Sequence, residues 1–310
     1  MHPTPLPLTH GALLLDNSAL EKYTTCKRSF EYNTINKRTL ANNKSALIYG
    51  GAVHKALELR SHGRIIDDQL AALHAYFEVN PFEVNDSEWR SPQIAADLVR
   101  LYNREYSIEP YDILSYTAKD GLPIKAIEVP FMHFLTDIYI PSITRDVIPV
   151  YYTGRIDLVV VDHNKSIYIM DHKTTSMTGA RFFDEFALSS QMLGYCWAVQ
   201  QSIQKPVNGY IVDALCSRKP TRTGVPFELT RQQFYTDQDA INEWRTNLGY
   251  LITDIVRDHE RSYYPMETKW CVGKYGRCPY FDVCTVPQSG RAALLQSNLF
   301  TDSTWSPLNH

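Results

Sequence analysis

Asp157, Asp171 and Lys173 are the residues whose types and spacing best suit a chemical reaction. Two carboxylates brought close together inside a protein repel each other unless a proton or a cation lies between them. A hard divalent ion such as Mg²⁺ or Mn²⁺ prefers oxygen ligands, and it can polarise a phosphodiester and activate a bound water. A nearby lysine can position that water or offset developing negative charge. The three residues therefore predict a site for metal-dependent hydrolysis.

A β-hairpin is expected to bring these residues together. Its strands are the β-rich segments 150–162 and 166–173, and the loop between them is His163-Asn164-Lys165. If the loop has three residues, the register places Asp157 opposite Asp171, with their Cβ atoms about 5 Å apart. Lys173 then points to the same face, two residues further on. A slip of one residue would turn one carboxylate away, so the expectation depends on the loop length.

An isolated Asp-x-Lys pattern is short and common, and by itself it is more often a solvated strand edge than a catalytic centre. Here three motifs occur in order: Gly154-Arg155-Ile156-Asp157, Asp171-His172-Lys173-Thr174-Thr175, and Gln191-x-x-x-Tyr195. This ordered series resembles the motifs of RecB-like PD-(D/E)XK nucleases. The resemblance implies that Asp157 and Asp171 hold metal and that Lys173 assists catalysis.

The same resemblance assigns roles to three further residues. It implies that the backbone carbonyl of His172 can bind the metal. Gln191 and Tyr195 are four residues apart and share one face of a predicted helix, which by resemblance meets the DNA and the catalytic centre. Without the other motifs, this helix is equally well explained as an ordinary one whose tyrosine packs in the core.

A histidine on another predicted helix extends the series. Residues 49–60 begin with two glycines and carry an apolar stripe, which predicts a helix. On this helix Gly51-x-x-His54 resembles the family's first motif, in which a histidine is an additional metal ligand. A single helix histidine is more often structural, so this assignment depends on the other motifs. Glu128, in a predicted strand at 126–131, matches an acidic position often seen in the family.

Four of the six cysteines form a second candidate site. Cys271, Cys278 and Cys284 lie close together in the sequence, and Cys26 lies near the start. The segment from Cys278 to Cys284 resembles the terminal cysteine motif of AddB-type, CRISPR-associated and exonuclease V-type iron–sulfur nucleases. Tyr23-x-x-Cys26-x-Arg28-x-Phe30 resembles their N-terminal element. The resemblance implies that the four cysteines bind one 4Fe–4S cluster, which four thiolates can hold.

Two features of the sequence depart from that cysteine pattern. Lys27 follows Cys26 where a proline is usual, and the gap from Cys271 to Cys278 is wider than the common spacing. A structural Zn²⁺ site uses the same ligands and stays open as an alternative. The other two cysteines, Cys196 and Cys216, lie in apolar segments and are expected to be buried thiols.

Composition limits the class of protein. Hydrophobic residues make up 44% of the chain and charged residues 21%, as in an ordinary globular protein. The net charge of −3 argues against passive coating of nucleic acid, so any DNA contact has to be local. Neither a secretory signal nor a long apolar run is evident, so we expect no membrane contact and a cytoplasmic protein of a prokaryote or of a phage-infected host.

The expected fold is an α/β restriction-endonuclease-like core with a central mixed sheet, a helical insertion and termini joined by the iron–sulfur cluster. Further predicted elements are a helix start at 17–30, a helix at 184–203, a strand at 208–215 and a helix at 231–260. The expected organisation is a leader at 1–16, a nuclease domain at 17–285 and a tail at 286–310. Within the domain, 61–125 is mostly a helical insertion and 262–285 is the cysteine motif.

These features together predict a Mg²⁺- or Mn²⁺-dependent DNA exonuclease of recombination, repair or phage DNA replication. Its substrate would be DNA that is single-stranded or has free ends, and a helicase or recombination protein would be its partner. Two alternatives stay open. One is a CRISPR-adaptation nuclease that trims short DNA, and the other is a non-cleaving DNA-binding subunit with a cysteine metal site. The intact Asp157, Asp171 and Lys173 argue against the second, because a domain without activity has no need for all three.

Overall fold

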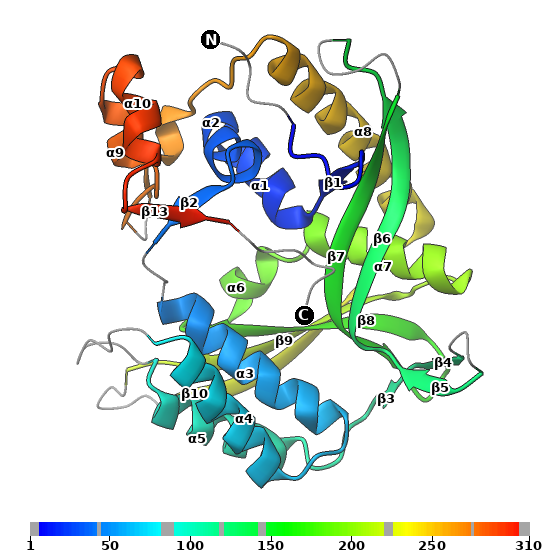
Figure 1. Ribbon diagram of the computed structural model, residues 1–310. Helices are drawn as coiled ribbons and strands as arrows, with labels where there is room; N and C mark the ends of the chain where they lie inside the picture. The colour runs from blue at the N-terminus through cyan, green and yellow to red at the C-terminus, as the bar shows by residue number, and fades with distance from the viewer. Residues whose placement is uncertain are drawn as a thin grey trace. The chain divides into compact units, whose positions relative to one another are not determined.

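The computed structural model describes residues 6–41, 45–81, 90–117, 121–141, 147–219, 226–273 and 276–303 (Figure 1). The chain divides into two units. Unit 1 comprises Met1–Asn42, Pro130–Gly154 and Glu243–His310, and unit 2 comprises Asn43–Val129 and Arg155–Asn242. Each unit is assembled from separate stretches of chain, and the segment 17–285 contributes to both.

The sheet of unit 2 is mixed, as the sequence predicts. Its main strands lie in the order β7, β8, β9, β10, with bounds Ile148–Val161, Ile167–Thr175, Gly209–Ser217 and Phe227–Tyr235. The pairs β7–β8 and β9–β10 are antiparallel, and β8–β9 is parallel. Strand β3 (Asp112–Ile113) also pairs with β7, as does β6 (Ile127–Ile138). Both β6 and β7 continue along the chain from one unit into the other.

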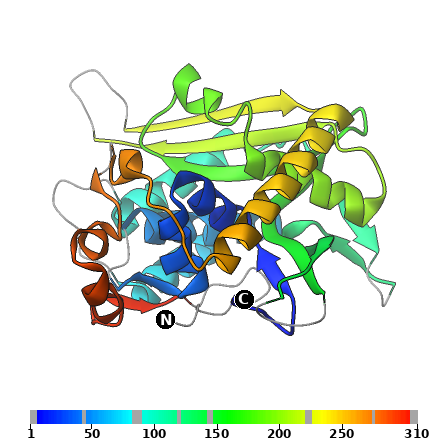
Figure 2. The ribbon, with the colours of Figure 1, turned by 90° about the horizontal axis from the view of Figure 1, so that it is seen from above.

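Helices cover both faces of this sheet, as Figures 1 and 2 show. Helices α3 (Ser45–Ser61), α4 (Ile66–Val79) and α5 (Pro92–Glu105) lie on one side, and α6 (Ala180–Asp184) and α7 (Ser190–Ile203) lie on the other. Every residue of β9 is buried, which is typical of a strand that is covered on both faces.

A small residue on α3 allows the helices on one face to pack closely. A Cβ atom added at Gly51 would clash with the hydroxyl of Tyr76 on α4. Ala52, Val53 and Ala56 of α3 are fully buried in the same cluster. The glycine of the Gly51-x-x-His54 motif therefore has a packing role, because it lets α4 approach the helix that carries His54.

The predicted helical insertion ends earlier than expected. Helices α4 and α5 match the periodicity of residues 67–78 and 88–106, although residues 82–89 lie outside the described part. After Glu105 the chain forms β3 and a separate hairpin of β4 (Ser115–Thr117) and β5 (Pro123–Lys125). After Glu105, the elements of the described residues up to 125 are therefore short strands.

The helix predicted at 231–260 was wrong at its start. Residues up to Tyr235 belong to β10, which pairs with β9 along its whole length, and α8 begins at Gln238 and ends at Glu260. The polar residues of Arg231-Gln232-Gln233 concealed the strand, because β10 is only partly buried and lacks an apolar run. The helix predicted at 184–203 begins later, because α6 ends at Asp184 and α7 runs from Ser190 to Ile203.

In unit 1 the described part of the expected leader, residues 6–16, contributes a strand to the fold. Leu13–Leu15 form β1, which pairs in parallel with residues 150–152 of β7, and Leu13 and Leu15 are almost fully buried. Helix α1 (Asn17–Thr25) begins after Asp16, whose Oδ1 accepts the N–H of Ala19 at 2.6 Å. The helix cap is therefore this aspartate, directly before the helix start expected at residue 17.

The described part of the expected C-terminal tail, residues 286–303, also forms regular elements. After α9 (Phe281–Thr285) the chain forms α10 (Gln288–Leu295) and β13 (Phe300–Asp302), and β13 pairs antiparallel with β2 (Arg38–Leu40). Unit 1 further contains α2 (Lys27–Phe30), a π-helical turn η1 (Glu31–Ile35), a 3-10 turn η2 (Thr268–Trp270) and the short hairpin of β11 (Val272–Gly273) and β12 (Gly276–Arg277). Among the described helices, none combines the length and the apolarity that a membrane span requires.

Candidate metal centre

The hairpin register predicted from the loop length is confirmed. Strands β7 and β8 pair from Val161↔Ile167 to Leu158↔Met170. Beyond Leu158↔Met170 this ladder ends, and the side chain of Asp157 provides the contact to β8: its carboxylate Oδ2 accepts the backbone N–H of His172 at 2.8 Å. The end of the ladder thus fixes the first aspartate against the strand that carries the second.

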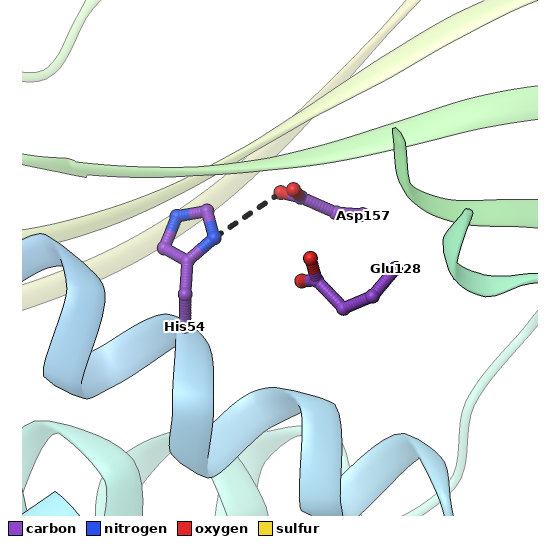
Figure 3. Close-up of side chains that lie close together, drawn as sticks. All are labelled: His54, Glu128 and Asp157. Carbon is purple, nitrogen blue, oxygen red and sulfur yellow. Dashed lines mark ion pairs between the residues drawn. The ribbon is translucent and has the colours of Figure 1, made fainter. Parts of the chain in front are cut away.

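Three side chains from three elements converge at this point (Figure 3). His54 comes from α3, Glu128 from β6 and Asp157 from β7, and one ligand atom from each lies within 4.8 Å of the others. His54 Nδ1 lies 3.5 Å from Asp157 Oδ2. Among the described residues, this is the one group of three or more histidine, cysteine or acidic side chains that meets this distance.

The charges of this group are unbalanced without a cation. Burial lowers the pKa of His54, but the Asp157 carboxylate outweighs burial and raises that pKa to about 9. Burial raises the pKa of Asp157, but the His54 imidazolium outweighs it and holds that pKa well below its ordinary value. In the metal-free protein at neutral pH, His54 is therefore protonated, and its positive charge stands beside Asp157 where a metal cation would otherwise lie.

The pKa values of two neighbouring carboxylates, Glu128 and Asp171, are raised. Burial raises the pKa of Glu128 to about 7, and the charge of Asp157 adds to the increase. Burial also raises the pKa of Asp171, although the ammonium of Lys173 acts in the opposite direction. Glu128 has a φ of 48°, a left-handed conformation that is rare for a residue other than glycine. Backbone strain of this kind costs on the order of 1–3 kcal/mol and clusters at functional sites.

The donor set fits a divalent metal ion. Two carboxylates and one imidazole are ordinary ligands for such an ion. A divalent charge would offset the negative charge of Asp157, which together with burial raises the pKa of Glu128. Replacing one oxygen ligand by nitrogen favours Mn²⁺ over Mg²⁺, because Mg²⁺ prefers oxygen more strictly. Asp171 is not in the group of three, because its Oδ2 forms an ion pair with Lys173 Nζ at 2.6 Å.

The lysine connects the centre to α7. Lys173 Nζ donates to Gln191 Oε1 at 3.3 Å, and Gln191 Nε2 donates to the hydroxyl of Tyr195 at 2.9 Å. Asp171 and Lys173 share one face of β8, because alternate strand residues point the same way. The structure therefore places four of the residues suggested by the motifs in one chain of contacts, from Asp171 to Tyr195.

His172 contacts a buried network on the opposite face, which sequence reasoning missed. Its Nδ1 lies 2.9 Å from Oδ2 of Asp213, a fully buried carboxylate on β9. The hydroxyl of Tyr102 on α5 donates to the same oxygen at 2.5 Å, and Arg231 Nε lies 3.1 Å from Asp213 Oδ1. Burial raises the pKa of Asp213, but the bond from His172 and the charge of Arg231 lower it below its ordinary value.

A signal for this network is present in the sequence. Asp213 is the one charged residue in the strand Gly209–Ser217, and a carboxylate in an apolar strand needs partners. Its partners Tyr102 and Arg231 come from distant segments, so the sequence cannot identify them. The network holds the imidazole ring of His172 in place. The backbone N–H of the same residue donates to the carboxylate of Asp157.

The cysteines of unit 1 lie in one region but do not form a tight site. Cys26 Sγ accepts the N–H of Glu267 at 3.4 Å, and Cys271 Sγ contacts the carbonyl of Glu267 at 3.8 Å. Cys278 N donates to the carbonyl of Cys271 at 2.9 Å. Burial raises the pKa of Cys284, and the thiols of Cys278 and Cys26 add to it, while Arg28 lowers it. Within the described part of the chain, no three of these sulfurs lie within 4.8 Å of one another.

That spacing bears on which group the cysteines could hold. Zn²⁺ binds thiolates at about 2.3 Å, so a zinc site would bring four sulfurs close together. A 4Fe–4S cluster is larger than one ion, so its ligands lie farther apart. All six cysteines are free thiols, and Cys196 and Cys216 are fully buried in unit 2 as expected.

Basic residues near the motifs are partly engaged in ion pairs. In unit 1, Lys27 Nζ lies 2.7 Å from Asp258 Oδ2, which also accepts the hydroxyl of Tyr23 at 2.5 Å. In unit 2, Arg218 lies 2.6 Å from Glu228. Each of these cations is therefore already balanced by a carboxylate, and sequence alone could not show this.

Comparison with known proteins identifies a family for most of the chain. The family model of the PD-(D/E)XK nuclease superfamily matches residues 17–285. The crystal structure of a candidate exonuclease from Eubacterium rectale has a TM-score of 0.52 at 11% sequence identity, and the match covers 83% of this chain and 85% of that one. At this identity the likeness concerns the fold alone.

Two further comparisons add nothing to this assignment. A protein named SSO0001 has a TM-score of 0.31 at 14% identity, with 76% of this chain and 84% of that chain covered, and this value is too low to support an argument. None of the curated proteins matches the chain.

Proposed function

The chain belongs to the PD-(D/E)XK nuclease superfamily, and from this membership and the geometry of the centre we propose that it is a metal-dependent deoxyribonuclease that hydrolyses phosphodiester bonds. The observation that carries the proposal is the convergence of His54, Glu128 and Asp157 within 4.8 Å, beside the Asp171–Lys173 ion pair. Three candidate metal ligands with a partly buried lysine beside them suit phosphodiester hydrolysis.

The side chains would divide the work as follows. His54, Glu128 and Asp157 would hold Mn²⁺ or Mg²⁺, with Asp171 as a further ligand, and the bound ion would polarise the phosphate and lower the pKa of a water. Lys173 holds a positive charge where negative charge develops on the phosphate oxygens. Gln191 fixes the position of that ammonium through its amide oxygen.

A metal ligand is also proposed in the backbone. The N–H of His172 is used by Asp157, and the carbonyl of His172 is proposed as a further ligand, by resemblance to the family. Tyr195 is proposed to support Gln191 from the next turn of α7, because its hydroxyl accepts from Gln191 Nε2.

We propose that the nuclease acts from DNA ends, in recombination, repair or phage replication, with a helicase or recombination protein as partner. The support for exonuclease action is the name of the Eubacterium rectale protein with the similar fold. Single-stranded and double-stranded oligonucleotides labelled at either end test this mode. Ladders that shorten from one end support it, whereas cleavage of closed circular DNA contradicts it.

The cysteine group is proposed to hold a structural 4Fe–4S cluster. The support is the resemblance of the cysteine motif, together with the contacts of Cys26 and Cys271 to the backbone of the same residue, Glu267, and of Cys278 to the carbonyl of Cys271. Protein purified without oxygen should be brown and contain about four irons per chain. Colourless protein with one zinc per chain would decide for the alternative.

The experiment that tests the proposed function is a cleavage assay with Mn²⁺ or Mg²⁺ on end-labelled DNA. Asp171→Ala should abolish cleavage and keep DNA binding. Near-normal cleavage by this variant would falsify the assignment. Asp68→Ala is the matched control, because Asp68 is an exposed aspartate in the first turn of α4 and should have no effect on cleavage.

A further inference from the structure

A cavity of about 570 Å³ adjoins the metal centre within unit 2. Leu57, which lines it, lies three residues after His54 and so close to the same face of α3, and the ring centroid of His172, another lining residue, lies 6.0 Å from that of His54. A molecule in the cavity would therefore lie against the same helix and strands that carry the proposed metal ligands.

The floor of the cavity is apolar. Leu158, Val160 and Met170 line it from β7 and β8, and each is nearly completely buried. Tyr102 and Tyr111 add aromatic side chains to the lining. Tyr102 is held in place by its hydrogen bond to Asp213, so its ring cannot leave the wall without breaking the buried network.

The charges in the lining balance each other. Arg60 Nη1 lies 2.9 Å from Glu109 Oε1, and Arg231 lies 2.6 Å from the other oxygen of the same carboxylate. Lys125 and Asp112, both exposed, bring one charge of each sign to the mouth. A cavity without excess positive charge does not suit a bare phosphate, whose binding requires uncompensated cations or amide donors.

The remaining polar groups suit a flat heterocycle. Ser107 offers an exposed hydroxyl, and the oxygens of Ser61 and Asn103, which already take part in hydrogen bonds within the protein, can each accept one more, beside the apolar strands and the tyrosines. An uncharged ring with donors and acceptors on its edge can stack on an aromatic side chain while its edge bonds to such groups. The volume lies within the range of small-ligand sites and is large enough for one nucleotide.

We propose that this cavity binds the unpaired base of the nucleotide next to the cleaved phosphate, so that the enzyme acts on single-stranded DNA. This inference rests on the proposed nuclease function. A base in a duplex cannot enter, because it is stacked and paired on both sides, and it would have to be turned out of the helix first. The cavity thus determines the strand preference and the metal centre performs the cleavage.

Abasic substitution combined with a blocking variant tests the proposal. End-labelled single strands carry an abasic sugar at one position at a time, and KM and kcat are measured with Mn²⁺. At the position next to the cleaved bond, loss of the base should raise KM at least about tenfold in the wild-type protein. In Ser107→Trp the effect should vanish, because the indole fills the exposed mouth of the cavity. Tyr111→Ala, a second variant that removes an aromatic wall, should reduce the effect.

Ser202→Trp is the matched control, because Ser202 is an exposed serine on α7 outside the lining. It should keep the full abasic effect. An abasic effect of less than twofold at every position in the wild-type protein overturns the inference. A full effect in both Ser107→Trp and Tyr111→Ala overturns it as well.

Calorimetry separates failure of this inference from failure of the proposed function. If no protein cleaves any DNA with either metal, the proposed function fails, and titration with deoxyadenosine monophosphate then tests the cavity alone. Binding to the wild-type protein that is lost in Ser107→Trp supports the cavity as a nucleotide site. Absent binding, or equal binding in both proteins, overturns it.

Discussion

The metal centre of unit 2 and the cysteine group of unit 1 both gather residues that are distant in the sequence, but they are held differently. In the metal centre the three candidate ligands lie within 4.8 Å of one another, the backbone N–H of His172 holds the Asp157 carboxylate, and Gln191 holds the Lys173 ammonium. Among the cysteines, Cys26 Sγ also accepts a backbone N–H, but no three of these four sulfurs, all within described segments, lie within 4.8 Å of one another.

The difference shows two ways in which a protein prepares for a metal. The centre of unit 2 is preorganised, so binding an ion requires mainly the loss of a proton from His54. The cysteine group lacks such support, so its final geometry depends on the group that it binds. Variants of the metal centre should therefore alter reactivity more than folding, and variants of the cysteine group should alter folding more than reactivity.

The largest effect is expected from Asp157→Asn. The amide keeps the shape but removes the charge that binds a metal and that holds the His54 imidazolium. Cleavage should fall at least about a thousandfold, while the melting temperature changes little. Single-turnover rates at saturating Mn²⁺ measure the effect. If the rate falls less than tenfold, the centre of catalysis lies elsewhere.

Metal affinity should depend strongly on pH, and His54 should be responsible. The pKa of His54 is about 9 and that of Glu128 about 7 in the metal-free protein, so binding a metal releases protons from both. Raising the pH removes these protons beforehand and strengthens binding. The dissociation constant for Mn²⁺ should fall about tenfold per pH unit from pH 7 to 9, and more steeply below 7.

His54→Ala sharpens this prediction. The slope between pH 7 and 9 should disappear in the variant, and the metal concentration for half-maximal cleavage should rise about a hundredfold. His62→Ala is the control, because His62 is exposed just after α3. An unchanged slope in His54→Ala would show that the histidine does not bind the ion.

Asp213→Asn tests whether the buried network extends the preorganisation of the metal centre. Without the charge, His172 loses its partner, and the backbone N–H that holds Asp157 becomes less well positioned. We expect kcat to fall about 10- to 100-fold with little change in KM. Asp213→Glu, which keeps the charge but not the fit, should not restore the rate. If the variant has a normal kcat and a lowered melting temperature, the network has only a structural role.

The smallest effects on chemistry are expected from the cysteines. Cys26→Ser should lower iron content and the melting temperature together, by roughly 5 °C, because only this ligand lies before the nuclease motifs. Cleavage per folded molecule should stay within about threefold of the wild-type value, since hydrolysis needs no electron transfer. Cys216→Ser is the control and should leave the iron content unchanged, because this buried thiol lies in unit 2. A loss of cleavage without loss of stability would contradict the division of roles between the two regions.

Local patterns in the sequence predicted the parts of the centre that depend on local geometry. The three-residue loop determined the β7–β8 register, and the four-residue spacing of Gln191 and Tyr195 placed both on one helix face. The hairpin and α7 obey periodicities of two and 3.6 residues, which a sequence displays directly.

The remaining features depend on contacts between distant segments, which a single sequence does not show. Glu128 reaches the centre through a left-handed backbone conformation, which no sequence pattern predicts. Asp213 can be identified from the sequence as a buried charge, because it lies in an apolar strand. Its partner Arg231 was predicted to lie in a helix, because a partly buried, polar strand resembles the exposed face of a helix. Leu13–Leu15 was expected to be a leader, because three residues are too few to show the period of a strand.

A crystal grown with Mn²⁺ and measured for anomalous scattering tests the central claim most directly. The account predicts one strong Mn²⁺ peak about 2.2 Å from ligand atoms of His54, Glu128 and Asp157, and its loss in crystals of Asp157→Asn. A protein that cleaves DNA in the same buffer but shows its peak elsewhere, or shows none between these three side chains, would contradict the account.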